Sequence, residues 1–105
     1  MHLTSFLQNG QLTIALTGEI DHHRAKGLIS AITGKIEAYN PSICILDFHD
    51  VTFMDSSGIA VVINVLRCMA KIEGKLILSD LGTQPMKVFR ASGIDKLVDI
   101  KEAVL

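Results

Sequence analysis

The apolar residues of this chain follow two different spacings that alternate along the sequence. Leu12, Ile14 and Leu16 alternate with other residues, as they do in a β-strand with one buried face. Over residues 22–38 the apolar residues instead recur every three or four positions, which places them along one side of a helix. A strand-like segment is followed by a helix-like segment twice more along the chain, so the sequence predicts strands that alternate with helices. Such strands pair in parallel through right-handed crossovers.

An antiparallel hairpin is predicted at the N-terminus. The dipeptide Asn9-Gly10 tolerates the positive backbone angles of a tight turn, and it separates residues 3–7 from the alternating residues 12–17. We expect these two segments to pair, with Gly18 closing the second strand.

The first helix has residues suited to its start and its end. Asp21 is placed to cap it, because a carboxylate accepts the unpaired N–H groups of a first turn. Asn40-Pro41 breaks the pattern at the other end. Gly27 and Gly34 lie inside this helix, where each costs roughly 1 kcal/mol relative to alanine.

A second strand and a second helix occupy the middle of the chain. Residues 43–46 form a continuous apolar run, which is typical of a central strand covered on both faces. Apolar residues then recur at helical spacing from Ile59 to Ala70. Gly74 suits a left-handed cap at the end of that helix.

The C-terminal part predicts shorter elements. Residues 75–79 resemble a strand, and residues 84–91 resemble a short helix with Pro85 near its start and Gly93 after its end. Residues 97–100 predict a last strand, followed by a turn of helix from Lys101.

Together these elements predict one α/β domain over residues 1–105. Its sheet is mixed and mostly parallel, starts with the antiparallel hairpin, and carries its helices mainly on one face. A chain of 105 residues is large enough for one hydrophobic core. Although 49% of the residues are hydrophobic, each apolar run is shorter than the roughly 20 residues that span a bilayer. We therefore expect no membrane association.

Charge and cysteine content argue against several classes of protein. The net charge is −1 and no Lys/Arg cluster stands out, so direct binding to nucleic acid is not expected. Residues 1–5 lack the features of a signal peptide, which predicts a cytoplasmic protein. Cys44 and Cys68 lie in apolar patterns and are predicted to be free buried thiols; a disulfide or a metal-binding pair is the alternative.

Asp55-Ser56-Ser57-Gly58 lies where a strand connection ends and the long second helix begins. A helix N-terminus favours negative charge, typically by about 0.3–1 kcal/mol at an exposed site, so a phosphate would be tolerated there. A serine at this place also serves as an N-cap, with Gly58 easing the turn. These four residues alone do not separate the two roles.

Two stretches resemble one known family. Residues 53–58, Phe-Met-Asp-Ser-Ser-Gly, are similar to the phosphorylation motif of the anti-sigma factor antagonists, members of the STAS domain family, in which the serine after the aspartate is the acceptor. Residues 18–25 resemble the loop before the first helix in the sporulation subgroup, where Gly-Glu-Leu-Asp-His-His is typical and where Ile20 replaces the leucine. Generic STAS domains often lack paired histidines, so His22-His23 favours the sporulation sigma-F pathway.

The resemblance implies a switch protein that catalyses nothing and needs no cofactor. Its unphosphorylated form would bind a dimeric, ATP-binding anti-sigma factor that is also a serine kinase, and would thereby free a sporulation sigma factor. Phosphorylation of Ser56 would block this binding, and a PP2C-type phosphatase would reverse it. The free protein would be a monomer. The alternative within the family is an interaction module of a stress-response phosphorelay or of a membrane transport complex.

The residues expected to contact the partner come from the same two stretches. They are Asp21, His22 and His23 in the first, and Asp55, Ser56, Ser57, Gly58 and Ile59 in the second. The resemblance implies that Asp21 pairs with a basic residue of the kinase. Six further apolar residues are expected to belong mostly to the core, or to an apolar rim around the switch, and an exposed one beside Ser56 would be suited to anchor a partner; they are Phe53, Met54, Ile59, Met86, Phe89 and Ile94. No third ligand follows the Asp-His-His run at a recognisable spacing, so no metal site is predicted.

An enzyme is the competing hypothesis from another class. Ser56 or Ser57 would be its nucleophile and a histidine its base. The sequence has neither a Gly-x-Ser-x-Gly elbow nor a Gly-x-x-x-x-Gly-Lys phosphate loop. We therefore expect no enzymatic activity.

Overall fold

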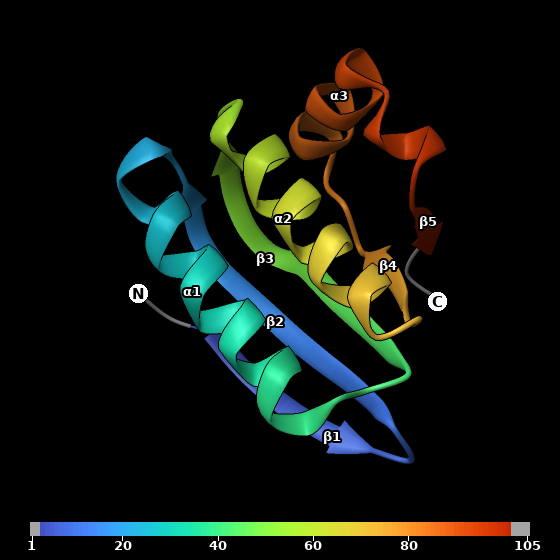
Figure 1. Cartoon of the computed structure of the whole chain (residues 1–105). Helices are drawn as coiled ribbons and strands as arrows, with labels where there is room; N and C mark the ends of the chain where they lie inside the picture. The colour runs from blue at the N-terminus through green and yellow to red at the C-terminus, as the bar shows by residue number, and fades with distance from the viewer. Residues whose placement is uncertain (1–2, 102–105) are drawn as a thin grey trace.

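The computed structural model describes residues 3–101 as a five-stranded sheet with three α-helices (Figure 1). Helices α1 and α2 lie side by side across one face of the sheet, and α3 packs beside α2. The strands are β1 (Leu3–Gln8), β2 (Gln11–Ile20), β3 (Ile43–Met54), β4 (Lys75–Ser79) and β5 (Asp99–Lys101). The helices are α1 (His22–Tyr39), α2 (Ser57–Lys71), α3 (Thr83–Ser92) and the short 3₁₀ helix η1 (Ile94–Lys96).

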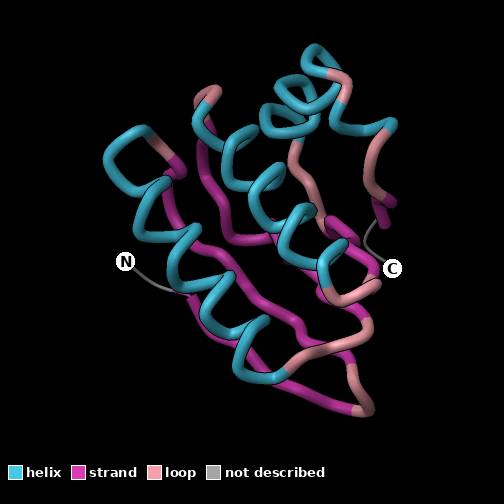
Figure 2. Tube along the Cα trace, in the orientation of Figure 1, coloured by secondary structure: helices cyan, strands magenta, loops and turns pink. Residues whose placement is uncertain are grey.

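The strands lie in the sheet in the order in which they occur in the chain (Figure 2). The pair β1–β2 is antiparallel and every following pair is parallel. Asn9 and Gly10 form the hairpin turn with φ values of 53° and 77°, the left-handed region that this dipeptide tolerates. The predicted mixed sheet with an N-terminal hairpin is confirmed.

The core lies between the sheet and the helices α1 and α2. Each strand sends alternate side chains into it, and in β3 these are Cys44, Leu46 and Phe48. Ile43 and Ile45 point to the opposite face and are only half-buried. The expectation that this strand is covered on both faces was therefore wrong, because α1 and α2 pack on one face.

Strands β2 and β3 are longer than the sequence predicts. Gly18, with φ +80°, lies at an irregularity in the β2–β3 register and does not end β2. β3 likewise continues past Leu46 to Met54. As a result the two strands end side by side at the register partners Ile20 and Met54, one residue before Asp21 and Asp55.

Gly74 does not form the predicted left-handed cap of α2. The left-handed residue is Glu73, with φ 57°. Gly74 is needed instead for close packing, since a Cβ there would lie 3.1 Å from the Ser42 carbonyl oxygen and 3.2 Å from that of Pro41. At the end of α3, by contrast, Gly93 follows the helix as predicted and is its left-handed cap, with φ 84°.

Both cysteines are free, as predicted, but only Cys44 is buried and Cys68 is half-buried. Burial raises the pKa of the Cys44 thiol to about 12, so this thiol is protonated at neutral pH. The last strand is β5, two residues later than predicted at its start, because η1 occupies residues 94–96. The turn of helix predicted from Lys101 lies almost wholly outside the described residues. Across residues 3–101, no helix combines the length and the apolar character that crossing a membrane requires.

Candidate functional site

The two stretches singled out in the sequence meet at one edge of the sheet. β2 and β3 are parallel neighbours, so their C-terminal ends lie together, and the Asp55 N–H donates to the Ile20 carbonyl oxygen at 3.0 Å. Helix α1 begins within residues 21–23 and helix α2 within residues 55–59, both at this edge (Figure 1). The structure therefore brings all eight predicted contact residues into one region, called here the switch edge.

Ser56 is exposed and occupies the N-cap position of α2, but its side chain makes no capping hydrogen bond. Asp55 performs that task, because its Oδ1 accepts the Ser57 N–H at 2.7 Å. The alternative in which Ser56 serves as the capping side chain is therefore not what the structure shows. Its hydroxyl is available for other chemistry.

Much of the N–H bonding capacity in the first turn of α2 is already used. Besides the Ser57 N–H, the Gly58 N–H donates to the Asp55 carbonyl oxygen and the Ile59 N–H to that of Ser56, each at 3.1 Å. A phosphoryl group on Ser56 would experience the helix dipole, but these donors already have partners. Such a group is therefore expected to remain at the surface.

The Asp55 carboxylate is held in its charged form. The backbone N–H of Ser57 is the main cause that lowers its pKa below the ordinary value, and the Ser57 hydroxyl acts in the same direction. His22, from the other stretch, adds to the effect through its backbone N–H and its ring. Asp55 therefore carries a full negative charge beside Ser56 at neutral pH.

We expect Asp55→Asn to weaken the folded state at neutral pH but not at acidic pH. Asparagine keeps an oxygen for the Ser57 N–H and loses only the charge. Because the folded-state pKa is lowered, the charge stabilises the fold fully above the ordinary pKa of about 3.9 and ceases to do so as pH falls through the folded value. Urea unfolding of both proteins across this range measures the difference. A difference that does not shrink on acidification would contradict the assignment.

The first stretch is shaped by Asp21 and by Arg24. Asp21 Oδ1 accepts the Arg24 N–H at 3.0 Å, which confirms the predicted cap. The Arg24 Nη1 donates to the carbonyl oxygens of Thr17, at 3.0 Å, and of Glu19. Gly18 leaves room for this guanidinium, because a Cβ there would lie 3.2 Å from Nη1. No sequence pattern singled out Arg24, whose bonds to main-chain oxygens leave no signature in the residue types.

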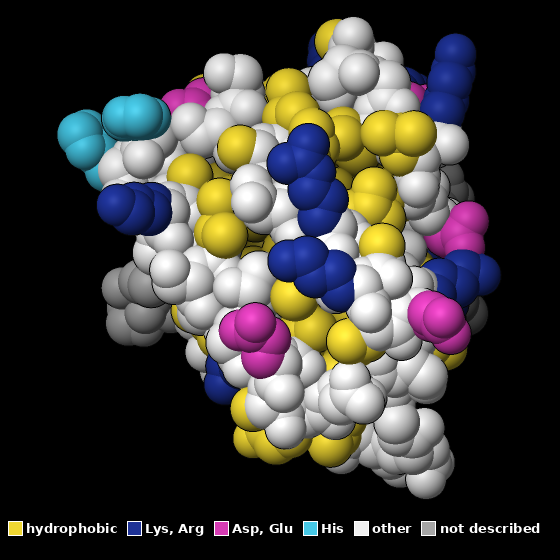
Figure 3. Space-filling view, in the orientation of Figure 1, with side chains coloured by type: hydrophobic (Ala, Val, Ile, Leu, Met, Phe, Trp, Pro, Cys, Tyr) yellow, Lys and Arg dark blue, Asp and Glu magenta, His cyan; other side chains and the backbone are white. Residues whose placement is uncertain are grey.

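His22 and His23 are both exposed, and their rings lie edge to face with centroids 6.0 Å apart. Figure 3 shows histidine side chains gathered at the corner where α1 begins. Among residues 3–101, no group of three or more His, Cys, Asp or Glu side chains is arranged to hold a metal ion. The pair is thus available to a partner that approaches the switch edge.

Gly58 is buried directly over the side chain of Met54. A Cβ on Gly58 would lie 2.1 Å from the Met54 sulfur and 2.4 Å from its Cγ. Met54 itself has no exposed surface. Glycine is therefore required here for close approach between the last residue of β3 and the first turn of α2.

Phe53 is the one exposed residue among the six candidate anchors, with 45% of its surface accessible. Met54, Phe89 and Ile94 are buried, and Ile59 and Met86 are half-buried. Phe53 lies two residues before Asp55, on the sheet face opposite to Met54. An exposed aromatic side chain beside the switch edge is suited to contact a partner.

Gln84 also reaches this site, although its sequence context gives no hint of it. Its side chain forms two hydrogen bonds with the backbone of Met54, on the side of β3 that faces away from β2. This places α3 in direct contact with the end of β3.

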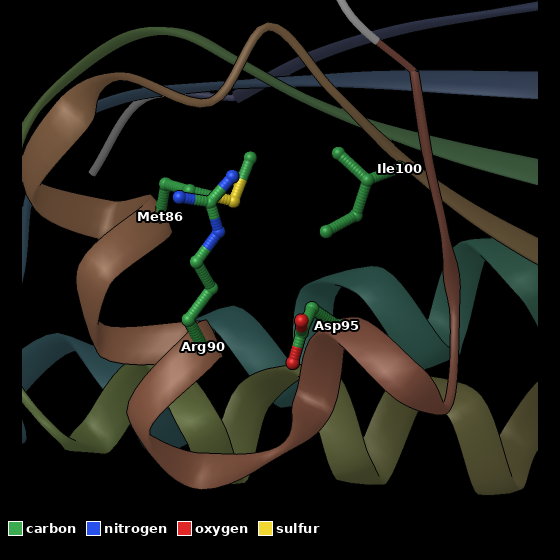
Figure 4. A pocket seen from close by; sticks show the side chains of 4 residues that line it. All are labelled: Met86, Arg90, Asp95 and Ile100. Carbon is green, nitrogen blue, oxygen red and sulfur yellow. The ribbon is translucent and has the colours of Figure 1, made fainter.

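Two hollows of the surface are lined by residues other than those of the switch edge. One of about 340 Å³ lies beside α3, and Figure 4 shows that its four labelled side chains come from α3, η1 and β5. These are Met86, Arg90, Asp95 and Ile100. Another, of about 390 Å³, lies between α1 and α2. None of the eight predicted contact residues lines either of these two hollows.

Comparison with known proteins gives a consistent family assignment. The model of the STAS domain matches residues 7–104. The anti-sigma F factor antagonist of Lysinibacillus sphaericus is 31% identical over 83 residues, which are 79% of this chain and 71% of that protein. The anti-sigma-B factor antagonist of Bacillus subtilis is 28% identical over 90 residues, which are 85% and 80% of the two chains.

The fold is also similar to that of the anti-sigma factor antagonist SpoIIAA, which has been solved in two forms. The unphosphorylated form superposes with a TM-score of 0.84 at 27% identity, covering 98% of this chain and 89% of the other. The phosphorylated form from Bacillus gives a TM-score of 0.76, also at 27% identity, covering 98% and 92%.

Proposed function

Because the chain belongs to the STAS domain family, we propose that it is an anti-sigma factor antagonist switched by phosphorylation of Ser56. In its unphosphorylated form it binds a dimeric, ATP-binding anti-sigma factor that is also a serine kinase, and so releases a sporulation sigma factor in the cytoplasm. Phosphorylation blocks that binding, and a PP2C-type phosphatase restores it. The free antagonist is a monomer.

The observation that carries this proposal is the state of Ser56. Its hydroxyl lies on the surface and is not used as a helix cap, because Asp55 takes that role. A kinase can therefore modify it without breaking a capping bond. The exposed His22 and His23, with Asp21 beside them, lie at the same edge and supply further polar contacts for a partner.

The family places this chain among regulatory proteins and not among enzymes. Ser56 is then the acceptor of a phosphoryl group from ATP bound by the partner. Its oxygen attacks the γ-phosphorus, the hydroxyl proton leaves, and ADP is released from the kinase. This chain contributes the acceptor and the surface on which the kinase recognises it.

The choice of the sporulation pathway rests on His22-His23 and on the anti-sigma F factor antagonist among the relatives. The anti-sigma-B factor antagonist of Bacillus subtilis is nearly as similar, and it supports a stress-response pathway as the second candidate. The two candidates differ in the anti-sigma factor that is bound. Binding measured against both types of anti-sigma factor therefore distinguishes them.

We expect the intact mass of the protein to increase by one phosphoryl group after incubation with its cognate anti-sigma kinase and magnesium-ATP. The Ser56→Ala variant is expected to gain nothing, because the acceptor oxygen is absent. Ser57→Ala is the matched control, and it should gain the same mass as the wild type.

Other outcomes of this experiment have definite meanings. Mass gained by Ser56→Ala but not by Ser57→Ala would move the acceptor to Ser57. No gain in the wild type, with a kinase shown to be active, would leave an unmodified binding module as the better description.

A further inference from the structure

The side chain of Gln84 binds the backbone of β3 as a neighbouring strand would. The Met54 N–H donates to Gln84 Oε1 at 2.9 Å, and Gln84 Nε2 donates to the Met54 carbonyl oxygen at 2.6 Å. Both backbone groups of one residue are thus paired by the amide of one side chain. Gln84 is the second residue of α3, so this bond joins α3 to the end of β3.

The position of this contact follows from the unequal lengths of the strands. β4 pairs with β3 only from Ile43 to Asp47, whereas β3 continues to Met54. Beyond Asp47, β2 is the strand that still pairs with β3, on the other side. β4 is too short to form backbone hydrogen bonds with the last residue of β3, and the side chain of Gln84 forms them instead.

Met54 and Asp55 are consequently fixed from opposite sides. Gln84 holds the backbone of Met54, and the Ile20 carbonyl oxygen on β2 holds the N–H of Asp55. The Met54 side chain is fully buried beneath Gly58 at the start of α2. The segment that carries Ser56 is therefore anchored at Met54 and Asp55 by α3, β2 and α2, and α3 contributes a single polar side chain.

We infer that Gln84 is a positioning residue of the phosphoacceptor. By pairing with Met54 it keeps the end of β3 in place, and this sets the orientation in which Asp55 and Ser56 are presented to the kinase. Without it, the N–H and C=O of Met54 lose their partners and the strand end opens. Ser56 then spends less time in the geometry that phosphoryl transfer requires. This inference rests on the proposed function.

The test uses Gln84→Met, which keeps the length of the side chain and removes both hydrogen bonds. Lys87→Met, on an exposed position of the same helix, is the matched control. With the anti-sigma kinase and magnesium-ATP, kcat for Gln84→Met is expected to fall by about tenfold, with KM changed by less than about twofold. Lys87→Met should retain both wild-type values.

Amide hydrogen exchange in the same variants separates positioning from a general loss of stability. In Gln84→Met the amides of Met54 and Asp55 should exchange about tenfold faster, while those of Cys44 and Leu46 in the middle of β3 keep their protection. An equal acceleration at all four amides would assign Gln84 to the stability of the whole fold and overturn the inference.

The kinetic result distinguishes the inference from the function on which it rests. If the wild type is phosphorylated and Gln84→Met is phosphorylated at the same rate, the inference alone is overturned. If the wild type is not phosphorylated by an active kinase, the proposed function fails, and the positioning role fails with it.

Discussion

A phosphoryl group on Ser56 is expected to weaken binding to the anti-sigma factor by at least about 100-fold, or about 2.7 kcal/mol, because like charges repel each other at an interface. The phosphoryl group adds a charge of about −1.5 to −2 beside the ionised Asp55. Ser57, Gly58 and Ile59 already use their N–H groups within the protein, so these donors do little to neutralise the new charge. When the partner docks, the phosphoryl charge must lose its water, and it repels any negative charge that the partner brings near.

Titration calorimetry of the phosphorylated and unphosphorylated proteins with the anti-sigma factor measures this effect. Gln8→Glu is the matched control, because it adds negative charge at an exposed position next to the hairpin turn, at the end of β2 opposite to Ile20. It should leave the dissociation constant unchanged. Equal affinities of the phosphorylated and unphosphorylated proteins would show that Ser56 lies outside the interface.

The second large effect is expected from Gly58→Ala. A Cβ would lie 2.1 Å from the Met54 sulfur, so Met54 must leave its buried site or α2 must shift. Overpacking of this kind typically lowers the free energy of unfolding by about 1–3 kcal/mol. Because Met54 directly precedes Asp55, the loss of stability should be accompanied by changed amide shifts at Asp55 and Ser56.

Two comparisons test the cause of that loss. Gly34→Ala, in α1, meets no atom within 4 Å, and it is expected to raise the free energy of unfolding by about 0.5–1 kcal/mol through the helix propensity of alanine. Adding Met54→Ala to Gly58→Ala should cost less than the sum of the two single changes, because the clash is relieved. Denaturant unfolding measures the three single variants, the double variant and the wild type. Strict additivity would show that Met54 and Gly58 do not compete for the same space.

The spacing of apolar residues predicted the order and type of the elements well, because the core lies against one face of each helix and of most strands. Some roles depend only on a residue's own backbone angles or on a cap within the next few residues, so residue type was enough to predict them. Examples are the cap at Asp21, the turn at Asn9-Gly10 and the helix end at Gly93. Gly74 could not be placed correctly. Its small size is required by the carbonyl groups of Pro41 and Ser42, more than thirty positions earlier in the chain.

The site was predictable only in part, for the same physical reason. Ser56 and its neighbours follow one another in the sequence, and the resemblance to the STAS family implied their role. Arg24 and Gln84 act through hydrogen bonds to main-chain groups, which lie five and seven residues before Arg24 and thirty residues before Gln84. Every residue type has those backbone groups, so no sequence pattern reveals which side chain will pair with them. The same holds for Phe53, whose exposure depends on which sheet face the helices leave open.

The order of the strands in the sheet has a consequence for how the chain folds. Because β1 to β5 lie in the order in which they are synthesised, each strand pairs with the one that precedes it, and no pairing requires the two ends of the chain to meet. Only the β1–β2 hairpin is closed by a short turn, whereas each parallel pairing must wait for a helical crossover, so the hairpin is expected to form first and the parallel pairings more slowly. Strands β1 and β5 form the two opposite edges of the sheet, and β3 lies midway between them (Figure 1).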